Sequence, residues 1–275
     1  EDQMRDFRDR VLALDANDPN GILIFDFETP EEHEPGTPTW QRPIISCQFS
    51  LGPGTGIFAM LNRDTRQWMA DILASSCRKA GHNVWDFDVP LAAYNNLPIA
   101  GVIDDTMWMF HHYQPDLTIE EAGKEAGNDF RFSTAAGLQY VASFYGADEH
   151  WKHLRLAKED EVQRQYGVLD VDNNARIVYG CNGYPSLPSQ LRAKNLWNGY
   201  DRYVRQFYPL LQKMAARGIP INRVKQLEMI DDLHKIQIEI DGKIQKLHPD
   251  ELKRVEPATG FKNGPKAGEK VKFDE

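Results

Sequence analysis

Two acidic residues alternate with two phenylalanines in the segment FDFET, residues 25–29. Side chains i and i+2 of a strand lie on the same face, so the carboxylates of Asp26 and Glu28 should emerge side by side. Neighbouring carboxylates repel each other unless a cation lies between them, and hard oxygen ligands suit Mg²⁺ or Mn²⁺. The pair predicts a divalent-metal site. The alternative is a pair of acids at a strand end that faces solvent.

A second acidic segment, HNVWDFD, spans residues 82–88. It places Asn83 five residues before Asp88, after a short apolar stretch that reads as a strand. We expect Asp88 to begin a helix and to share a cation with Asp26. A helix cap that needs no metal is the alternative.

These segments resemble the first two motifs of the DEDD superfamily of 3′–5′ exonucleases, which have a ribonuclease-H-like fold. Two further stretches, VIDDTMWMFHHYQPDL and LQYVASFYGADEHWK, are similar to the proofreading domains of family A DNA polymerases, particularly phage-type ones. The segment YPLLQKMAARGIPINRVKQLEMI, residues 208–230, resembles the start of a family A polymerase domain. The resemblance covers residues 20–235, in the order that the family shows.

The resemblance implies a two-metal phosphodiesterase that binds the 3′ end of single-stranded DNA and releases nucleoside monophosphates. By position, Asp26 would bridge two ions, Mg²⁺ or Mn²⁺, while Glu28 would hold the ion that activates water and Asp88 the other. A third motif, Tyr-x-x-x-Asp, would add the fourth acid and a hydroxyl that orients the water. Residues beside the acids would contact the substrate: Phe27, Thr29, Asn83, Trp85 and Phe87. For the aromatic residues among them, packing in the core is the alternative.

The third motif departs from the family pattern in our preferred alignment. In VYGCNGYP, Tyr179 supplies the tyrosine, but Gly183 stands where the fourth acid is expected. Glycine has no side chain that can bind a metal, so we expect a proofreading site with impaired catalysis.

Two other alignments remain open. Tyr166 and Asp170 also match Tyr-x-x-x-Asp, although the stretch around Asp170 reads as a loop and lies farther from the polymerase-like segment. Alternatively, Asp172 or Asn182 replaces the missing acid.

The periodicity of the chain predicts an α/β domain with a mixed sheet. The resemblance makes this a ribonuclease-H-like sheet flanked by helices and followed by a helical extension. We expect an exonuclease domain over residues 1–205 and the start of a polymerase domain over 206–275. The expected elements are strands at 22–27, 43–50, 56–60 and 81–85, helices at 64–80 and 89–95, a mostly helical region at 134–245, and a helix restart at 186 or 187.

The chain has 275 residues, a net charge of −9 and three cysteines without CxxC spacing. This composition does not suit a generic nucleic-acid coat, a disulfide framework or a zinc site. No apolar run approaches the roughly 20 residues of a membrane span, and the charged N-terminus is unlike a signal peptide. We therefore expect no membrane partner and a cytoplasmic protein of phage or bacterial replication, not a secreted one.

The expected partners are the 3′ end of a single strand or primer–template and the rest of a polymerase chain. Two rival functions remain: a non-catalytic DNA-binding or scaffolding domain, which Gly183 favours, and a free-standing RNA-processing exonuclease. The residues after 230 contain no polymerase active-site motif.

Overall fold

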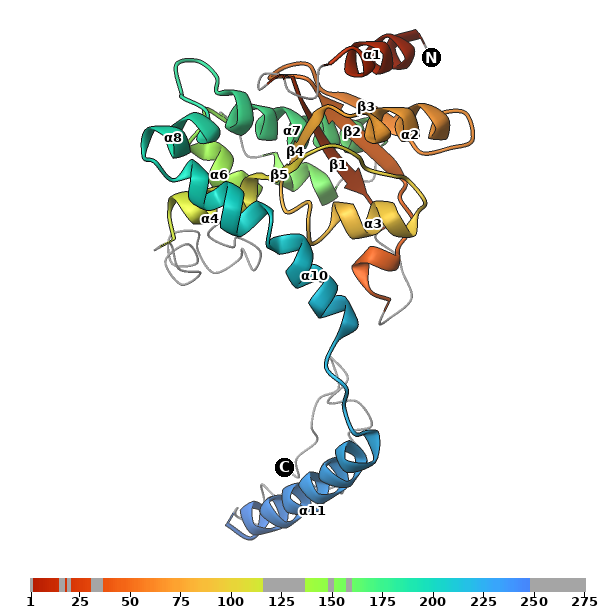
Figure 1. The fold of residues 1–275 in the computed structure, drawn as a ribbon. Coiled ribbons are helices and arrows are strands. Elements are labelled where there is room, and N and C mark those ends of the chain that lie inside the picture. The colour runs from red at the N-terminus through yellow and green to blue at the C-terminus, as the bar shows by residue number, and fades with distance from the viewer. Residues whose placement is uncertain are drawn as a thin grey trace. The chain divides into compact units, whose positions relative to one another are not determined.

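The structure is a computed structural model that describes residues 2–14, 18, 21–30, 37–115, 137–147, 151–156 and 160–247. The chain divides into two compact units, Glu1–Ala216 and Arg217–Glu275 (Figure 1). Residues 248–275 of the expected polymerase segment lie outside the described residues.

A mixed sheet of five strands lies at the centre of the first unit, in the order β3-β2-β1-β4-β5. The first three strands are antiparallel neighbours, whereas β1, β4 and β5 run parallel. This is the ribonuclease-H-like arrangement, which confirms the predicted fold class. The strands are β1 (Ile22–Glu28), β2 (Ser46–Ser50), β3 (Ile57–Met60), β4 (Arg78–Gly81) and β5 (Ile103–Asp105).

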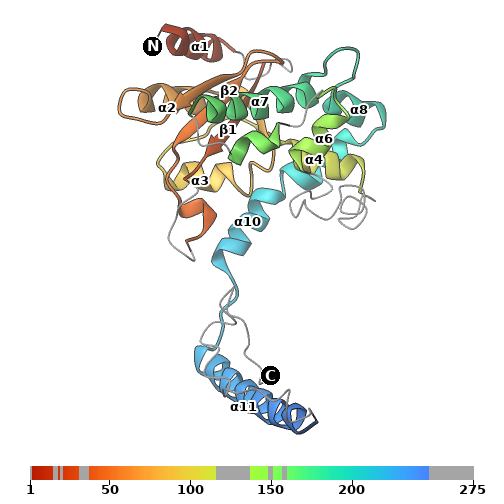
Figure 2. The same cartoon turned by 180° about the vertical axis from the view of Figure 1, so that it is seen from behind.

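Helices surround the sheet, and α7 crosses one of its faces over β1 and β2 (Figure 2). The described helical elements that begin in the first unit are α1 (Asp2–Leu12), η1 (Thr39–Gln41), α2 (Arg66–Ala74), α3 (Asp88–Tyr94), α4 (Thr106–Tyr113), α6 (Leu138–Ser143), η2 (Lys152–Leu156), α7 (Asp160–Tyr179), α8 (Leu187–Ala193), α9 (Trp197–Gly199), η3 (Tyr200–Arg205) and α10 (Tyr208–Arg217). The predicted helix restart after the proline-rich turn is confirmed, because Ser186 caps α8 by accepting a hydrogen bond from the Ser189 amide.

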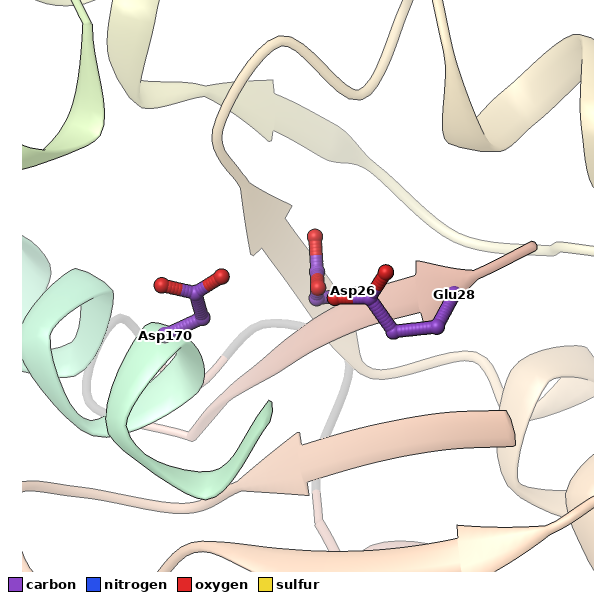
Figure 3. Close-up of side chains that lie close together, drawn as sticks. All are labelled: Asp26, Glu28 and Asp170. Carbon is purple, nitrogen blue, oxygen red and sulfur yellow. The ribbon is translucent and has the colours of Figure 1, made fainter. Parts of the chain in front are cut away.

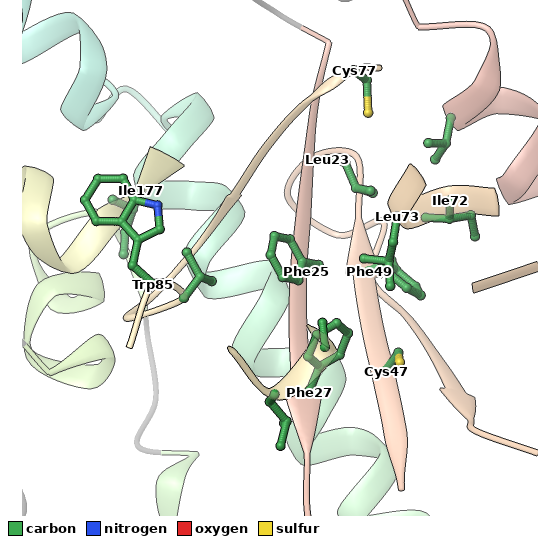
Figure 4. Close-up of a cluster of buried hydrophobic side chains, with 14 of the residues drawn as sticks. Leu23, Phe25, Phe27, Cys47, Phe49, Ile72, Leu73, Cys77, Trp85 and Ile177 are labelled. Atoms are coloured by element: carbon green, nitrogen blue, oxygen red, sulfur yellow. The ribbon is translucent and has the colours of Figure 1, made fainter. Parts of the chain in front are cut away.

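Strand β1 separates two hydrophobic layers by simple alternation. Its odd-numbered residues, Leu23, Phe25 and Phe27, are buried in the main core with side chains of β2 and α2 (Figure 4). Its even-numbered residues Ile22 and Ile24 pack instead in a second cluster with side chains of α7. Full burial of each large apolar side chain stabilises the fold by about 1.5–3 kcal/mol. The same alternation directs Asp26 and Glu28 toward the α7 side of the sheet.

Strand β4 was predicted incorrectly as the end of a helix over 64–80, followed by a strand over 81–85. Helix α2 ends at Ala74, and the strand is Arg78–Gly81. The strand is hard to recognise in the sequence because it contains Lys79, which is fully buried. The Lys79 ammonium is satisfied there by the carbonyl oxygens of Ser75 (2.6 Å), Cys77 (3.1 Å) and Ala100 (2.8 Å), to which it donates hydrogen bonds. Burial lowers the pKa of Lys79.

The prediction that the stretch around Asp170 forms a loop was also wrong. Asp170 lies in the middle of α7, a helix of 20 residues. Asp and Asn are poor helix formers because their side chains bond the backbone in other conformations. In α7 these side chains have partners elsewhere: Asp172 Oδ1 accepts from the Gly56 amide (2.9 Å), and Asn174 Oδ1 accepts from the Thr106 hydroxyl (2.8 Å). Tertiary contacts override the local preference here.

The two C-terminal helices differ in how they are packed. Tyr208, at the start of α10, stacks on Trp85 with ring centroids 5.0 Å apart, so this turn belongs with the first unit. The second unit contains α11 (Arg223–Leu247), which has no buried residue in the structure. None of the helices among the described residues has the length and apolar character needed to cross a membrane.

Candidate metal centre

Three carboxylates meet where the end of β1 faces the middle of α7. Asp26 and Glu28 extend from the strand, and Asp170 points toward them from the helix (Figure 3). One carboxylate oxygen from each residue lies within 4.8 Å of the others. Asp170 is buried, while Asp26 and Glu28 are half-buried. The structure therefore brings together two acids that the sequence analysis preferred and one that belongs to the less favoured alignment.

Asp170 is held from outside the cluster by two consecutive residues. The Lys152 ammonium donates to both carboxylate oxygens, at 2.7 and 2.8 Å, and the Trp151 indole N–H donates to Oδ1. Charge-assisted hydrogen bonds of this kind are stronger than neutral ones. The sequence analysis missed both residues as part of the site, because they lie 18 and 19 positions before Asp170 with no local pattern that links them to it.

Tyr166 lies one helical turn before Asp170 and faces the same cluster. Its hydroxyl oxygen is 3.2 Å from the Lys152 ammonium. Burial raises the pKa of Tyr166, and the negative charges of Asp170, Glu28 and Asp26 raise it further. The hydroxyl therefore keeps its proton at neutral pH and can donate a hydrogen bond at the centre.

Asp88 begins α3 beside this cluster, as the sequence predicts. Its Oδ1 accepts a hydrogen bond from the Phe27 amide at 3.0 Å, which ties α3 to the strand that carries the other acids. Its Oδ2 is buried and has no hydrogen-bond partner within the part of the chain that the structure describes. Burial raises the pKa of Asp88, and the nearby charge of Asp26 raises it further.

Asp105 positions the loop that leads into Asp88. It caps α4, and its carboxylate accepts from the amides of Asn83 (3.0 Å), Trp85 (3.2 Å) and Met107 (3.0 Å). The loop needs this support because Asn83 adopts a left-handed conformation with φ of 62°. Burial raises the pKa of Asp105 to about 7, although these amides lower it.

Thr106 ties α7 to the sheet. Its hydroxyl oxygen lies 2.8 Å from Asn174 Oδ1, 3.1 Å from the Gly81 carbonyl oxygen and 3.0 Å from His82 Nδ1. Asn174 lies one turn after Asp170, so this contact fixes the helix close to the cluster. Together, Asp105 and Thr106 set the positions of Asp88 and Asp170.

The preferred third motif is not at this centre. Tyr179 lies at the end of α7, where its hydroxyl donates to the carbonyl oxygen of Ile22 and accepts from the Ile22 amide at 2.9 Å. Ile22 begins β1, whereas the acids lie at the other end of that strand. Gly183 is exposed in the turn Cys181–Tyr184 with φ of 87°, and a Cβ built there would have no described atom within 4 Å. This placement favours the alternative alignment on Tyr166 and Asp170 over the one that ended on Gly183.

The proposed substitutes for the missing acid are also elsewhere. Asp172 faces the loop between β2 and β3, where it accepts from the Gly56 amide and the Ser50 hydroxyl. Asn182 is exposed in the same turn as Gly183. Neither residue belongs to the group of three carboxylates.

The residues expected to contact substrate divide by burial. Phe27 and Trp85 are buried, at 1% and 3% exposure, and pack in the main core. This burial favours core packing, the alternative for these two rings, over stacking on a base. Thr29, Asn83 and Phe87 are half-buried beside the acids, at positions compatible with the prediction.

The donor set fits a hard divalent cation. The three clustered side chains offer only carboxylate oxygens, which Mg²⁺ and Mn²⁺ prefer. Asp88 adds a buried oxygen without a hydrogen-bond partner among the described residues, and buried polar atoms rarely remain so unless a ligand or water satisfies them. Asp26, Glu28 and Asp170 could hold one cation, and Asp26 with Asp88 a second.

No protein-family model and no curated protein matches the chain. Among solved structures, the apo form of a nuclease is 20% identical, covering 75% of this chain and 89% of that chain with a TM-score of 0.43. Brucella melitensis NrnC is 15% identical over 72% of this chain and 86% of that chain, with a TM-score of 0.44. The EXD2 exonuclease domain soaked in Mg and GMP is 15% identical over 80% and 93%, with a TM-score of 0.29. At these identities and scores the likenesses are too weak to assign an activity to this chain.

Proposed function

We propose that the chain is a 3′–5′ exonuclease that hydrolyses the terminal phosphodiester of a single-stranded DNA with the help of two divalent cations. The observation that supports this most strongly is the convergence of Asp26, Glu28 and Asp170 within 4.8 Å, with Asp88 beside them. Two such cations, when bound about 4 Å apart, stabilise the attacking and leaving oxygens of an in-line displacement.

The residues of the chain have separable roles in this proposal. Asp26 would contribute to both cation positions, while Glu28 and Asp170 would hold the cation on the water side. The Tyr166 hydroxyl, protonated at neutral pH, orients the attacking water. Lys152 and Trp151 hold the Asp170 carboxylate in place.

The proposed setting is proofreading in a family A polymerase of phage type, in the cytoplasm of a bacterial cell, where the 3′ end of the primer is the substrate. The resemblance of residues 208–230 to the start of a polymerase domain supports it. The observation that favoured a non-catalytic scaffold was Gly183, which lies in an exposed turn away from the acids. RNA processing is the second candidate, since these acids recognise no base or sugar.

The test is digestion of an oligonucleotide labelled at its 5′ end, with Mg²⁺ or Mn²⁺ and with EDTA. We expect a ladder that shortens from the 3′ end, requires the metal and is faster on DNA than on RNA of the same sequence. Asp26→Asn should slow it by at least about 100-fold, because it removes a shared ligand.

The matched control is Asp172→Asn, which makes the same substitution at an acid of α7 that lies outside the cluster. Metal-independent digestion, or equal loss in both variants, would contradict the proposal. Faster digestion of RNA would favour the second candidate.

A further inference from the structure

A small cavity lies at the beginning of β1, on the side of the sheet that α7 covers. Its volume is about 110 Å³, several times the space that one water requires. Its polar and charged lining residues are Arg78, Asp104, Tyr179, Ser186 and Arg192, with Trp197 among the apolar ones.

This cavity is separate from the metal centre. Ile22, which lines it, precedes Asp26 by four strand residues, or about 13 Å at the rise of a β-strand. Tyr179 follows Asp170 by nine helical residues, which is also about 13 Å. A ligand in the cavity would therefore not touch the acids.

Three hydrogen-bond donors without acceptors among the described residues line this cavity: one is buried, and two are within reach of solvent. The Nε atom of Arg78 is buried and has no partner in the described part of the protein. The Ser186 oxygen accepts from the Ser189 amide, and its proton has no acceptor in the ranges that the structure covers. Arg192 is exposed, so water reaches its guanidinium, which lies 4.1 Å from the centroid of the Trp197 ring and pairs with no carboxylate of the described residues.

The carboxylate that lines the cavity is already compensated. Asp104 Oδ2 accepts from Arg78 Nη2 at 2.7 Å, and its Oδ1 accepts from the Tyr200 hydroxyl at 3.2 Å and from Arg205 Nη1 at 3.4 Å. Arg205 also pairs with Asp201. Two carboxylates thus balance two guanidinium groups, and the charge of Arg192 remains in excess.

Arg78 and Arg192 lie close enough to repel each other. The pKa of Arg192 is lowered by burial and then by the charge of Arg78, while the charge of Asp104 acts in the opposite direction. Stacking on Trp197 holds the Arg192 guanidinium in place despite this repulsion. An anion between the two arginines would relieve the repulsion and satisfy their free N–H groups.

We propose that this cavity binds a single phosphate-type oxyanion. A tetrahedral anion of this size fits about 110 Å³, and its oxygens accept hydrogen bonds from all three donors. Inorganic phosphate and a phosphodiester group of a nucleic acid share this chemistry. The site lies outside the proposed nuclease centre and does not depend on it.

Phosphate binding is measured on the whole chain in EDTA, so that metal-bound phosphate does not contribute. Thermal unfolding is followed while sodium phosphate is added, against sodium chloride at equal ionic strength. A ligand that binds only the folded state raises the midpoint in proportion to its occupancy. In a second arm, an oligonucleotide without terminal phosphates replaces inorganic phosphate.

Arg192→Gln should raise the apparent Kd by at least about 10-fold, because one charged partner is lost. Arg202→Gln, which changes an exposed arginine that does not line the cavity, should leave the Kd unchanged. Ser186→Ala should weaken binding less, and it serves as the readout if circular dichroism shows that Arg192→Gln is misfolded.

Arg192-dependent binding in either arm supports the site and identifies the source of the anion. The proposal is overturned if phosphate stabilises the chain no more than chloride, or if Arg192→Gln binds as tightly as the unaltered chain.

Discussion

Lys152 and a divalent cation should compete for the Asp170 carboxylate. The ammonium contacts both oxygens of Asp170, at 2.7 and 2.8 Å, and lies 3.2 Å from the Tyr166 hydroxyl. The Trp151 indole already occupies part of the space around Oδ1. A cation that binds Oδ1 of Asp170 must therefore displace either Lys152 or Trp151, and even at Oδ2 it shares the oxygen with the positive charge of Lys152. Replacing Lys152 with methionine removes the ammonium and keeps a side chain of similar length.

The size of the effect follows from the contact that is displaced. A hydrogen bond to a charged group contributes about 1.5–3 kcal/mol, which corresponds to about 10- to 150-fold in affinity. The Lys152 side chain is 29% exposed, and solvent weakens such pairs, so we expect the lower part of this range. Mn²⁺ should bind Lys152→Met about 10-fold more tightly than the unaltered chain.

Isothermal titration of the metal-free protein with Mn²⁺, at constant pH and ionic strength, measures this change without any substrate. Lys194→Met is the matched control, because the Lys194 ammonium lies 4.0 Å from the centroid of the Tyr113 ring and contacts no acid of the cluster. Unchanged or weaker Mn²⁺ binding in Lys152→Met, with an unchanged unfolding midpoint, would refute the competition and show that Lys152 only orders the carboxylate.

Three other changes test separate parts of the structure. Burial raises the pKa of Asp105 from 3.8 to about 7, so between these pH values the folded state keeps a proton that the unfolded state has released. In EDTA the free energy of unfolding should therefore fall as pH rises from about 4 to 7, by at most about 1.4 kcal/mol per pH unit from this group. Urea denaturation at several pH values measures this slope, and an equally steep slope in Asp105→Asn would contradict the prediction. Tyr166→Phe should slow digestion by about 100-fold. Tyr179→Phe should lower the free energy of unfolding by about 1 kcal/mol and leave the digestion rate unchanged. The reverse pattern would favour the alignment on Tyr179 and Gly183. In Gly167→Ala the added Cβ would lie 2.7 Å from Cγ of the buried Gln48, so we expect a loss of about 1–3 kcal/mol in urea denaturation, and a neutral result would mean that α7 is less closely packed on β2.

The first part of the site could be predicted because strand geometry is strictly periodic. The alternation of FDFET placed Asp26 and Glu28 on one face, and the structure has them there with Phe25 and Phe27 on the other. The helix start at Asp88 was readable for a similar local reason, since a short apolar stretch and an acid precede a helical pattern.

The third acid was not recognised because its helix depends on distant contacts. The region around Asp170 contains Asp and Asn residues that locally favour turns, and their partners, such as Gly56 and Thr106, come from other parts of the chain. The stretch around Tyr179 was preferred because of its spacing from the polymerase-like segment and its better local helical character. Lys79 misled the prediction of β4, because a lysine is not expected in a buried strand; carbonyl groups of the preceding turn and of Ala100, 21 residues away, satisfy its ammonium.

The central claim is that Asp170, and not position 183, completes the metal centre. It is tested most directly by comparing the Mn²⁺-dependent digestion rates of the unaltered chain, Asp170→Asn and Gly183→Asp on the same single-stranded DNA. We predict that Asp170→Asn loses at least about 100-fold in rate and that Gly183→Asp digests at the unaltered rate. Full activity in Asp170→Asn, or digestion that requires Gly183→Asp, would contradict the account.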